Sequence, residues 1–329
     1  MRALKLESDG LQLLTAHPAP GGAGEAIVRP TRVAVGSTDV EVCRGLMGFR
    51  GVVGQQFVGV VESVDDPEGR ALVGQRVVSS PIVSCAACDL CRSGLSAHCR
   101  QRTIIGMSGR DGCLAEQIAL PVRNLVPVPD SVDDSRAIFA WLVASAQHVA
   151  QQLTIEGRPY ITVLGDGPLG MIVAQVLVRQ NASVRVVGRY SEKMSRCERW
   201  EIRHRHVDDV GRRSDQDIVI DCTGHPDGLS DALQLVRPRG QIVRKTLLAA
   251  GNRMERQPLD LNSLVLEEIK LLGSGGGSGA GSIAGAIDAL ERNAVDVVGL
   301  ADRRMRLDDG PRILHAVAEV GAMAVDVEI

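Results

Sequence analysis

The feature that most constrains this chain is a glycine-rich turn between two apolar runs. Residues 160–164 (Tyr-Ile-Thr-Val-Leu) have the composition of a buried parallel strand. Residues 165–170 follow as Gly-Asp-Gly-Pro-Leu-Gly, and residues 169–178 predict a mostly buried helix. A strand, a Gly-x-Gly-x-x-Gly turn and a helix in this order predict a dinucleotide-binding unit, in which a pyrophosphate lies on the helix N-terminus.

Each glycine of the turn has its own task in such a unit. The first allows the tight turn, the second lets the backbone approach the pyrophosphate, and the third lets the helix pack close to the strand. We therefore expect the turn to bind the coenzyme through Gly165, Gly167, Pro168, Leu169 and Gly170.

The end of the second predicted strand, residues 184–187, bears on the choice of nucleotide. NAD sites carry a carboxylate there for the ribose 2′-hydroxyl, whereas NADP sites carry an arginine for the phosphate. The strand ends here in Gly188 and Arg189 without a carboxylate, and Arg189, Ser191 and Lys193 could surround a phosphate. NADP(H) is therefore favoured over NAD(H). The alternative is that Arg189 stacks on the adenine or lies in water.

Four of the eight cysteines are crowded into residues 85–99, as Cys85-x2-Cys88-x2-Cys91-x7-Cys99. Two tight turns can bring three of the sulfurs around one ion, and a short loop returns the fourth. Four thiolates without an open position make a closed tetrahedral zinc site, which is structural. We therefore expect one structural zinc per chain. His98 is a rival ligand, but four cysteines already complete the shell.

Composition excludes several classes of partner. The net charge of −3 suggests neither nucleic acid nor an anionic membrane as a partner. The chain has no run of 18 apolar residues, and it opens on a strand-like segment, residues 1–6. We therefore expect no membrane span, no signal peptide and a cytoplasmic protein.

The rest of the chain falls into a β-rich part and an alternating part. Residues 1–80 predict antiparallel strands of a partly open barrel. Beyond residue 160, strands alternate with helices, which predicts a doubly wound parallel sheet. The other expected elements are helices at 133–153, 229–236, 283–293 and 310–320, a solvated helix face at 196–205, and strands at 218–222, 242–247, 269–272, 295–298 and 324–329.

This order of parts resembles the medium-chain dehydrogenase/reductase superfamily, in particular its zinc-containing alcohol dehydrogenases, over essentially the full length. Besides the four-cysteine lobe and the glycine turn, the matching segments are residues 36–39 (Gly-Ser-Thr-Asp), 54–61, 110–117, 221–224 and 237–240. The resemblance implies a GroES-like barrel domain (1–141 and 276–329) and a Rossmann domain (142–275), with the active-site cleft between them. It also implies a homodimer or homotetramer, with residues 269–272 and 295–298 as candidate dimer strands.

Where the family holds its catalytic zinc, this sequence departs from the pattern. The ligand positions are Gly36, Gln55 and Trp141, and Gln56 replaces a neighbouring glutamate. Glycine has no ligand atom, tryptophan only donates, and glutamine oxygens are weak ligands for zinc. The comparison implies that no catalytic zinc is bound. Thr38 matches the position whose hydroxyl bonds the substrate oxygen.

Three functions remain open. The first is a zinc-free NAD(P)H reductase of an activated C=C, C=O or C=N substrate, in which Thr38, Gln55 or Gln56 donates to the developing oxyanion and Trp141 partly refills the pocket. The second is a non-catalytic or regulatory member of the family. The third is an alcohol or polyol dehydrogenase with a relocated metal site. That site would use Glu41, Cys43 or His148, although packing or solvation explains such isolated residues more simply. By resemblance, Thr223, Gly224, Gly273 and Ser274 lie near the nicotinamide end of the coenzyme.

Overall fold

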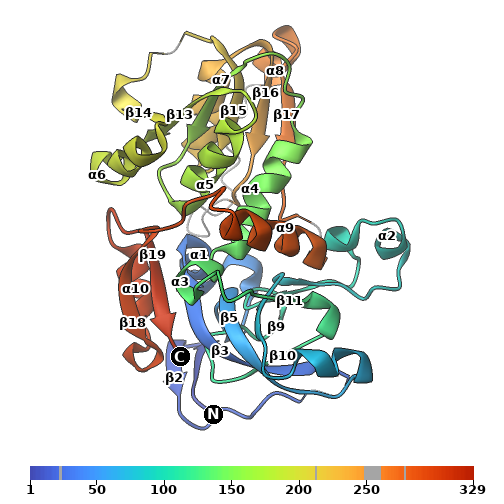
Figure 1. Ribbon diagram of the computed structural model, residues 1–329. Helices are drawn as coiled ribbons and strands as arrows, with labels where there is room; N and C mark the ends of the chain where they lie inside the picture. The colour runs from blue at the N-terminus through green and yellow to red at the C-terminus, as the bar shows by residue number, and fades with distance from the viewer. Residues whose placement is uncertain (22–23, 212, 248–260, 278) are drawn as a thin grey trace. The chain divides into compact units, whose positions relative to one another are not determined.

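The computed structural model describes residues 1–21, 24–211, 213–247, 261–277 and 279–329. The chain forms two compact units (Figure 1). One unit comprises Met1–Ala144 with Gly277–Ile329, and the other comprises Ser145–Gly276. Among the described residues, no helix has the length and apolar character needed to cross a membrane.

The first unit is built on a mainly antiparallel sheet with the order β11-β6-β5-β3-β19-β18, in which β10 also pairs with β3. Its strands are β3 (Ala26–Val35), β5 (Gln56–Val64), β6 (Arg76–Ser79), β10 (Ile118–Leu120), β11 (Leu125–Pro127), β18 (Ala301–Arg306) and β19 (Ala324–Glu328). Two small sheets complete the unit, β2 (Gly10–Leu14)-β1 (Ala3–Glu7)-β4 (Gly51–Val52) and β7 (Ile82–Val83)-β8 (Thr103–Ile105)-β9 (Gly109–Arg110). The predicted GroES-like barrel is confirmed.

Aliphatic side chains fill the interior of this barrel, because the chain has few aromatic residues. β3 and β5 approach so closely at Gly59 that a Cβ there would lie 2.6 Å from the Arg29 carbonyl oxygen. The helices of the unit are α1 (Ser37–Cys43), α2 (Asp89–Arg92), α3 (Asp134–Ala137), α4 (Ala140–Gln152, which continues into the second unit), α9 (Gly279–Glu291) and α10 (Arg312–Ala318). The single helix predicted over 133–153 is divided, because the chain turns at Ile138 and Phe139 and buries both side chains.

The prediction of a strand at residues 295–298 is wrong. Val298 donates its backbone N–H to Asp296 Oδ1 at 2.9 Å, a local turn that bends the chain out of an extended conformation. The strand forms later, as β18, and pairs in parallel with β19. Of the other candidate dimer segment, residues 269–272, all but Ile269 lie in a strand.

The second unit is a six-stranded parallel sheet with the order β14-β13-β12-β15-β16-β17. Its strands are β12 (Tyr160–Leu164), β13 (Ser183–Gly188), β14 (Arg203–His206), β15 (Gln216–Asp221), β16 (Val236–Arg244) and β17 (Lys270–Gly273). The connecting helices are α5 (Pro168–Val178), α6 (Ser191–Met194), α7 (Asp227–Leu235) and α8 (Leu261–Leu266). The order reverses between β12 and β15, the switch point at which such sheets bind ligands.

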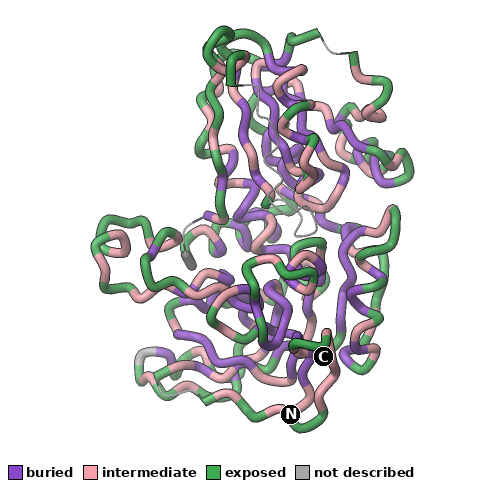
Figure 2. The backbone as a smooth tube through the Cα atoms, turned by 180° about the vertical axis from the view of Figure 1, so that it is seen from behind, coloured by how far each residue is buried: buried purple, intermediate pink, exposed green. Residues whose placement is uncertain are grey.

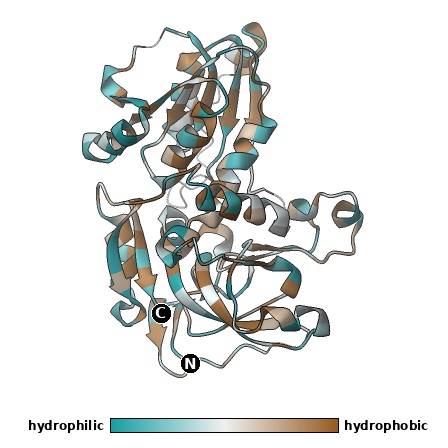
Figure 3. Ribbon diagram, in the orientation of Figure 1, coloured by the Kyte–Doolittle hydropathy of each residue, from teal (hydrophilic) through white to brown (hydrophobic). Residues whose placement is uncertain are grey.

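The central strands of this sheet are buried and apolar (Figures 2 and 3). Parallel strands are covered on both faces, so they read as continuous apolar runs. The strand order and the parallel pairing confirm the predicted doubly wound sheet.

One prediction in this unit is wrong: residues 196–205 are not a helix. They form the 3₁₀ turn η5 (Ser195–Trp200) and the edge strand β14, whose Arg203 pairs with Arg185 of β13. Residues 203–206 alternate arginine and histidine, so they lack the alternation of apolar and polar residues that predicts a strand. The segment becomes a strand through its backbone pairing with β13.

Candidate functional site

The glycine turn after β12 has the close packing that the sequence predicts. Gly165 has φ +116°, and a Cβ there would lie 2.9 Å from the Cys222 carbonyl oxygen. A Cβ on Gly170 would lie 2.1 Å from the Gly165 carbonyl oxygen, whereas a Cβ on Gly167 would meet nothing within 4 Å. Gly167 therefore leaves open space at the start of α5, where Pro168 occupies the first turn. The free amides of that turn and the helix dipole favour an anion there.

Asp166, inside the same turn, is a residue whose role the sequence interpretation missed. Its Oδ2 accepts hydrogen bonds from the backbone N–H groups of Arg189 (2.7 Å) and Tyr190 (2.8 Å). A Cβ on Gly188 would lie 2.4 Å from this oxygen, so glycine is required where the carboxylate passes. The glycine turn and the end of β13 are thus joined, and a carboxylate lies beside the residues predicted to hold a 2′-phosphate.

The three side chains predicted to surround that phosphate differ in accessibility. Arg189 and Ser191 are exposed. Lys193 is buried, and its ammonium lies 4.8 Å from the centroid of the Tyr190 ring. Cation–π contact with Tyr190 therefore already engages Lys193.

At the carboxyl end of β15, Asp221 organises the residues predicted near the nicotinamide. Asp221 is fully buried, and its Oδ2 lies 2.8 Å from Arg244 Nη1. Its Oδ1 accepts from the backbone N–H (2.9 Å) and the hydroxyl (2.7 Å) of Thr223. Gly224 donates its N–H to Thr246 Oγ1 at 2.7 Å. These bonds fix the turn after β15 against the end of β16.

Lys245, the first residue after β16, is a second residue that the sequence interpretation missed. It is 9% exposed, and its ammonium donates to the carbonyl oxygens of Ser274 and Gly275 beyond β17. Burial lowers the pKa of Lys245 to about 8. Ser274 Oγ beside it is buried without a hydrogen-bond partner among the described residues. An ammonium and an unpaired hydroxyl therefore lie together at the carboxyl edge of the sheet.

The four cysteines of residues 85–99 form the predicted metal cluster. Their sulfurs all lie within 4.8 Å of one another, with Cys85–Cys99 at 3.4 Å, Cys88–Cys91 at 3.5 Å and Cys88–Cys99 at 3.8 Å. Four sulfurs at about 2.3 Å from a tetrahedral zinc are separated by about 3.8 Å, so the cluster fits zinc. The backbone N–H groups of Cys91 and Arg100 lower the pKa of Cys88 to about 6, which favours the thiolate that zinc requires. His98 is exposed.

Three of the positions that correspond to the family's catalytic-zinc site, Gly36, Gln55 and Gln56, lie near the start of α1. Gln56 begins β5 and pairs with Ala34 of β3, two residues before Gly36. Gly36 donates its N–H to Asp39 Oδ2 at 2.9 Å and caps α1. In the described structure, three buried polar atoms here have no hydrogen-bond partner, namely Asp39 Oδ1, Gln55 Nε2 and Gln56 Oε1. These atoms provide hydrogen-bonding capacity that a polar ligand or water could use.

Asp39 is the ionisable group of this cluster. It is 2% exposed, and burial raises its pKa to about 6, although the backbone amides of Gly36, Asp39 and Gly54 favour the charged form. Burial, together with the same carboxylate, raises the pKa of Cys43 to about 12. Cys43 is therefore a protonated thiol at neutral pH when no metal is bound.

The other candidates are placed as follows. Thr38 is exposed in the first turn of α1, and Trp141 is half-buried in the first turn of α4. Glu41 lies 2.8 Å from Arg44 Nη1 in an ion pair, and His148 lies within α4. Across the described residues, the four-cysteine cluster is the only group of three or more His, Cys, Asp or Glu ligands close enough to share a metal ion.

Two protein families match the sequence. The alcohol dehydrogenase GroES-like domain matches residues 22–130, and the zinc-binding dehydrogenase family matches residues 168–292. Among curated relatives, the L-threonine 3-dehydrogenase of Legionella pneumophila (strain Corby) is 23% identical over 269 residues, 77% of each chain. The starvation-sensing protein RspB of Escherichia coli (strain K12) is 28% identical over 243 residues, covering 69% of this chain and 70% of that protein.

Solved structures share the fold over the whole chain. The short chain alcohol dehydrogenase RspB of E. coli CFT073, complexed with NADH, has a TM-score of 0.87 at 22% identity and covers 100% of this chain and 99% of its own. Galactitol-1-phosphate dehydrogenase from E. coli has a TM-score of 0.85 at 18% identity and covers 100% of both chains.

Proposed function

The chain belongs to the zinc-containing alcohol dehydrogenase-like proteins of the medium-chain dehydrogenase/reductase superfamily, and on that premise we propose that it is an NAD(P)H-dependent reductase that works without a catalytic zinc. Its substrate would be a small molecule with an activated C=C, C=O or C=N bond, which needs less polarisation than a simple alcohol or ketone. The bound nicotinamide would supply the hydride.

The observation that supports this proposal is the kind of side chain found at the start of α1, where the family binds its catalytic zinc. Gly36 offers no ligand atom, and Gln55 and Gln56 offer neutral amides in place of histidine and glutamate. Asp39, the one carboxylate in the cluster, uses one oxygen to accept from Gly36, and burial holds part of its population in the neutral acid form near pH 6. These groups are weak ligands for zinc, and Gln55 Nε2 can instead donate a hydrogen bond to a substrate oxygen.

The same residues can assist a reduction in another way. Gln55 Nε2 is a buried donor without a partner in the described structure, and Thr38 carries an exposed hydroxyl on the adjoining turn. Donors fixed in a buried site stabilise an oxyanion more than they do in water. We propose that Thr38 and the two glutamines orient the substrate oxygen.

An alcohol or polyol dehydrogenase with a relocated metal site is the second candidate. The relatives support it, because they include L-threonine 3-dehydrogenases. Against it, Glu41 is engaged with Arg44, and Glu41, Cys43 and His148 belong to no group of potential metal ligands among the described residues.

Zinc content separates these candidates. Purified protein is expected to carry one zinc per chain, because within the described part of the chain only the cysteine lobe offers a complete ligand set. Elemental analysis with a chelator titration would check this, and Cys88→Ser should bring the content close to zero. A reproducible two zinc ions per chain would overturn the zinc-free reductase.

The variant Gly36→Cys/Gln55→His/Trp141→Glu provides a positive control for that measurement. A Cβ on Gly36 would meet nothing within 4 Å, so the cysteine fits sterically. This variant is expected to take up a second zinc.

We also propose that NADP(H) is the preferred coenzyme. Exposed Arg189 and Ser191 support this preference, whereas the Asp166 carboxylate beside them opposes it, because it would lie near a second negative group. The two backbone hydrogen bonds to Asp166 offset part of that charge.

Arg189→Ala is expected to weaken NADPH binding about tenfold or more and to change NADH binding little, because only the 2′-phosphate needs the guanidinium. Fluorescence titration with each nucleotide would measure both affinities. Arg179→Ala, an exposed change at the other end of α5, is the control. Equal losses for both nucleotides after Arg189→Ala would remove the phosphate role.

For assembly, we propose a homodimer through β17, with a homotetramer as the larger alternative. β17 is an edge strand of its sheet, and Leu271 on it is 38% exposed.

A further inference from the structure

The connection between β14 and β15 is short for a crossover in a parallel sheet. It comprises residues 207–215, and its described residues contain only the 3₁₀ turn η6 (Val207–Asp209). The chain must cross three strand spacings, about 14 Å, and also return from the carboxyl to the amino end of the sheet. The connection would span only about 14 Å if helical. The described part of this connection contains no α-helix, whereas the other described connections of this sheet each contain one.

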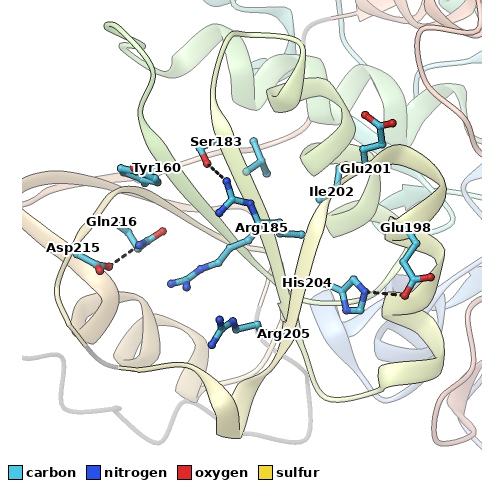
Figure 4. Close-up of a pocket in the computed structure, with 12 residues that line it drawn as sticks. Tyr160, Ser183, Arg185, Glu198, Glu201, Ile202, His204, Arg205, Asp215 and Gln216 are labelled. Atoms are coloured by element: carbon cyan, nitrogen blue, oxygen red, sulfur yellow. Dashed lines mark hydrogen bonds and ion pairs between the residues drawn. The ribbon is translucent and has the colours of Figure 1, made fainter.

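This short connection covers only half of one sheet face. Val207 and Val210 pack against the apolar cluster that contains Leu164 and Val187 at the carboxyl half. At the amino half, the sheet surface is a hollow of about 760 Å³ (Figure 4).

Polar side chains of three neighbouring strands line this hollow. The strand register places Thr162 of β12 beside Arg185 of β13, and Arg185 beside Arg203 of β14. Arg205 follows two residues after Arg203 on the same face, and Figure 4 shows Arg185 and Arg205 directed into the hollow. We call these three arginines and the space above them the arginine hollow.

The floor of the arginine hollow is a hydrogen-bonded network. Arg185 Nε donates to Thr162 Oγ1 at 2.7 Å, and Thr162 donates to Gln216 Oε1 at 2.7 Å. Gln216 Nε2 donates to Asp215 Oδ1 at 2.6 Å. A parallel sheet face that packs under a helix is apolar, so this network marks a face built to meet polar groups.

Among the described residues, the guanidinium groups of Arg203 and Arg205 are not paired directly with a carboxylate. Arg203 donates to Ser183 Oγ at 3.0 Å, and neither Arg203 nor Arg205 forms an ion pair with a described residue. Burial, together with Arg205 and Arg203, lowers the pKa of Arg185, while Asp215 acts in the opposite direction. An anion among the three arginines would relieve their mutual repulsion.

Carboxylates at the border of the arginine hollow limit the charge of an anion that can bind there. Glu198 and Glu201 line one side, with Glu198 3.5 Å from His204, and Asp215 lines the other. A polyanion would meet these carboxylates, whereas one phosphate group fits among the arginines. Tyr160, 57% exposed on the opposite wall, offers a ring to an organic group.

We propose that the arginine hollow binds a phosphate monoester, at the edge of the sheet opposite the glycine turn. The planar guanidinium forks of Arg203 and Arg205 would hold the phosphate, and the organic part would lie towards Tyr160. This site does not depend on the proposed reductase activity.

Phenyl phosphate is a suitable probe, with phenol as the uncharged control. Calorimetric titration of the full chain should show binding that Arg203→Gln/Arg205→Gln weakens at least tenfold. Both arginines are exposed, so the double variant should fold normally. Arg179→Gln/Arg196→Gln removes the same charge from the same unit outside the hollow and should stay within twofold of the unsubstituted protein.

Hydrogen exchange would locate the site, because the amides of β14 should be protected by phenyl phosphate and not by phenol. Absence of binding, equal affinity in the two double variants, or protection confined to the glycine turn would each overturn the proposal.

Discussion

Gly170→Ala is expected to destabilise the dinucleotide-binding unit severely, whereas Gly167→Ala is expected to leave it folded and unable to bind coenzyme. The Cβ that alanine adds at position 170 would lie 2.1 Å from the Gly165 carbonyl oxygen, a backbone atom that cannot move without opening the turn. Such overpacking costs about 1–3 kcal/mol and occasionally more, and the very short contact here favours the upper end. At Gly167 the backbone has φ −81° and a Cβ meets nothing within 4 Å, so the fold tolerates alanine.

The effect of Gly167→Ala would be seen in coenzyme binding and not in the stability of the fold. A Cβ there points into the space through which the pyrophosphate reaches the backbone, so coenzyme affinity should fall at least tenfold. Thermal unfolding and nucleotide titration of both variants would separate the two effects. Gly281→Ala, at an exposed position of α9 with open space, is the matched control. Normal coenzyme binding by Gly167→Ala would place the pyrophosphate elsewhere.

Coenzyme affinity is expected to fall as pH rises through about 8, and Lys245→Met is expected to abolish this dependence while weakening binding about tenfold. The Lys245 ammonium donates hydrogen bonds to the carbonyl oxygens of Ser274 and Gly275. Ser274 is one of the residues predicted to lie near the nicotinamide. Burial lowers its pKa to about 8, so the ammonium is largely charged below pH 7 and largely neutral at pH 9. An anionic coenzyme binds the charged form better, so affinity is highest at the lower pH.

The measurement is a nucleotide titration at several pH values between 6.5 and 9. Lys270→Met, on the exposed strand β17 of the same sheet, should keep both the affinity and its pH dependence. An unchanged affinity across this range in the unsubstituted protein would show that the charge of Lys245 does not contribute to coenzyme binding.

The parts of the fold that the sequence predicts are those with local signals. Residues 160–178 form a strand, a turn and a helix because their apolar runs and glycines act within a few residues of one another. The cysteine cluster is local in the same way, since all four ligands lie within residues 85–99.

The parts that failed or were missed depend on distant partners. β14 has no apolar period, and its backbone becomes a strand only through pairing with β13. Asp166 gains its role from amides 23 and 24 residues further on, and Lys245 from carbonyls about 30 residues further on. Neither spacing leaves a pattern in the sequence.

The compactness of the cysteine lobe affects the order in which the chain can fold. All four ligands and the Asp89–Arg100 ion pair come from one short loop, which needs little chain entropy to close. The lobe buries little apolar surface, since Leu95 on it is 48% exposed. Metal uptake can thus order residues 85–99 before the barrel strands have paired. Loss of the metal would expose a protease-sensitive loop while the barrel core remains folded.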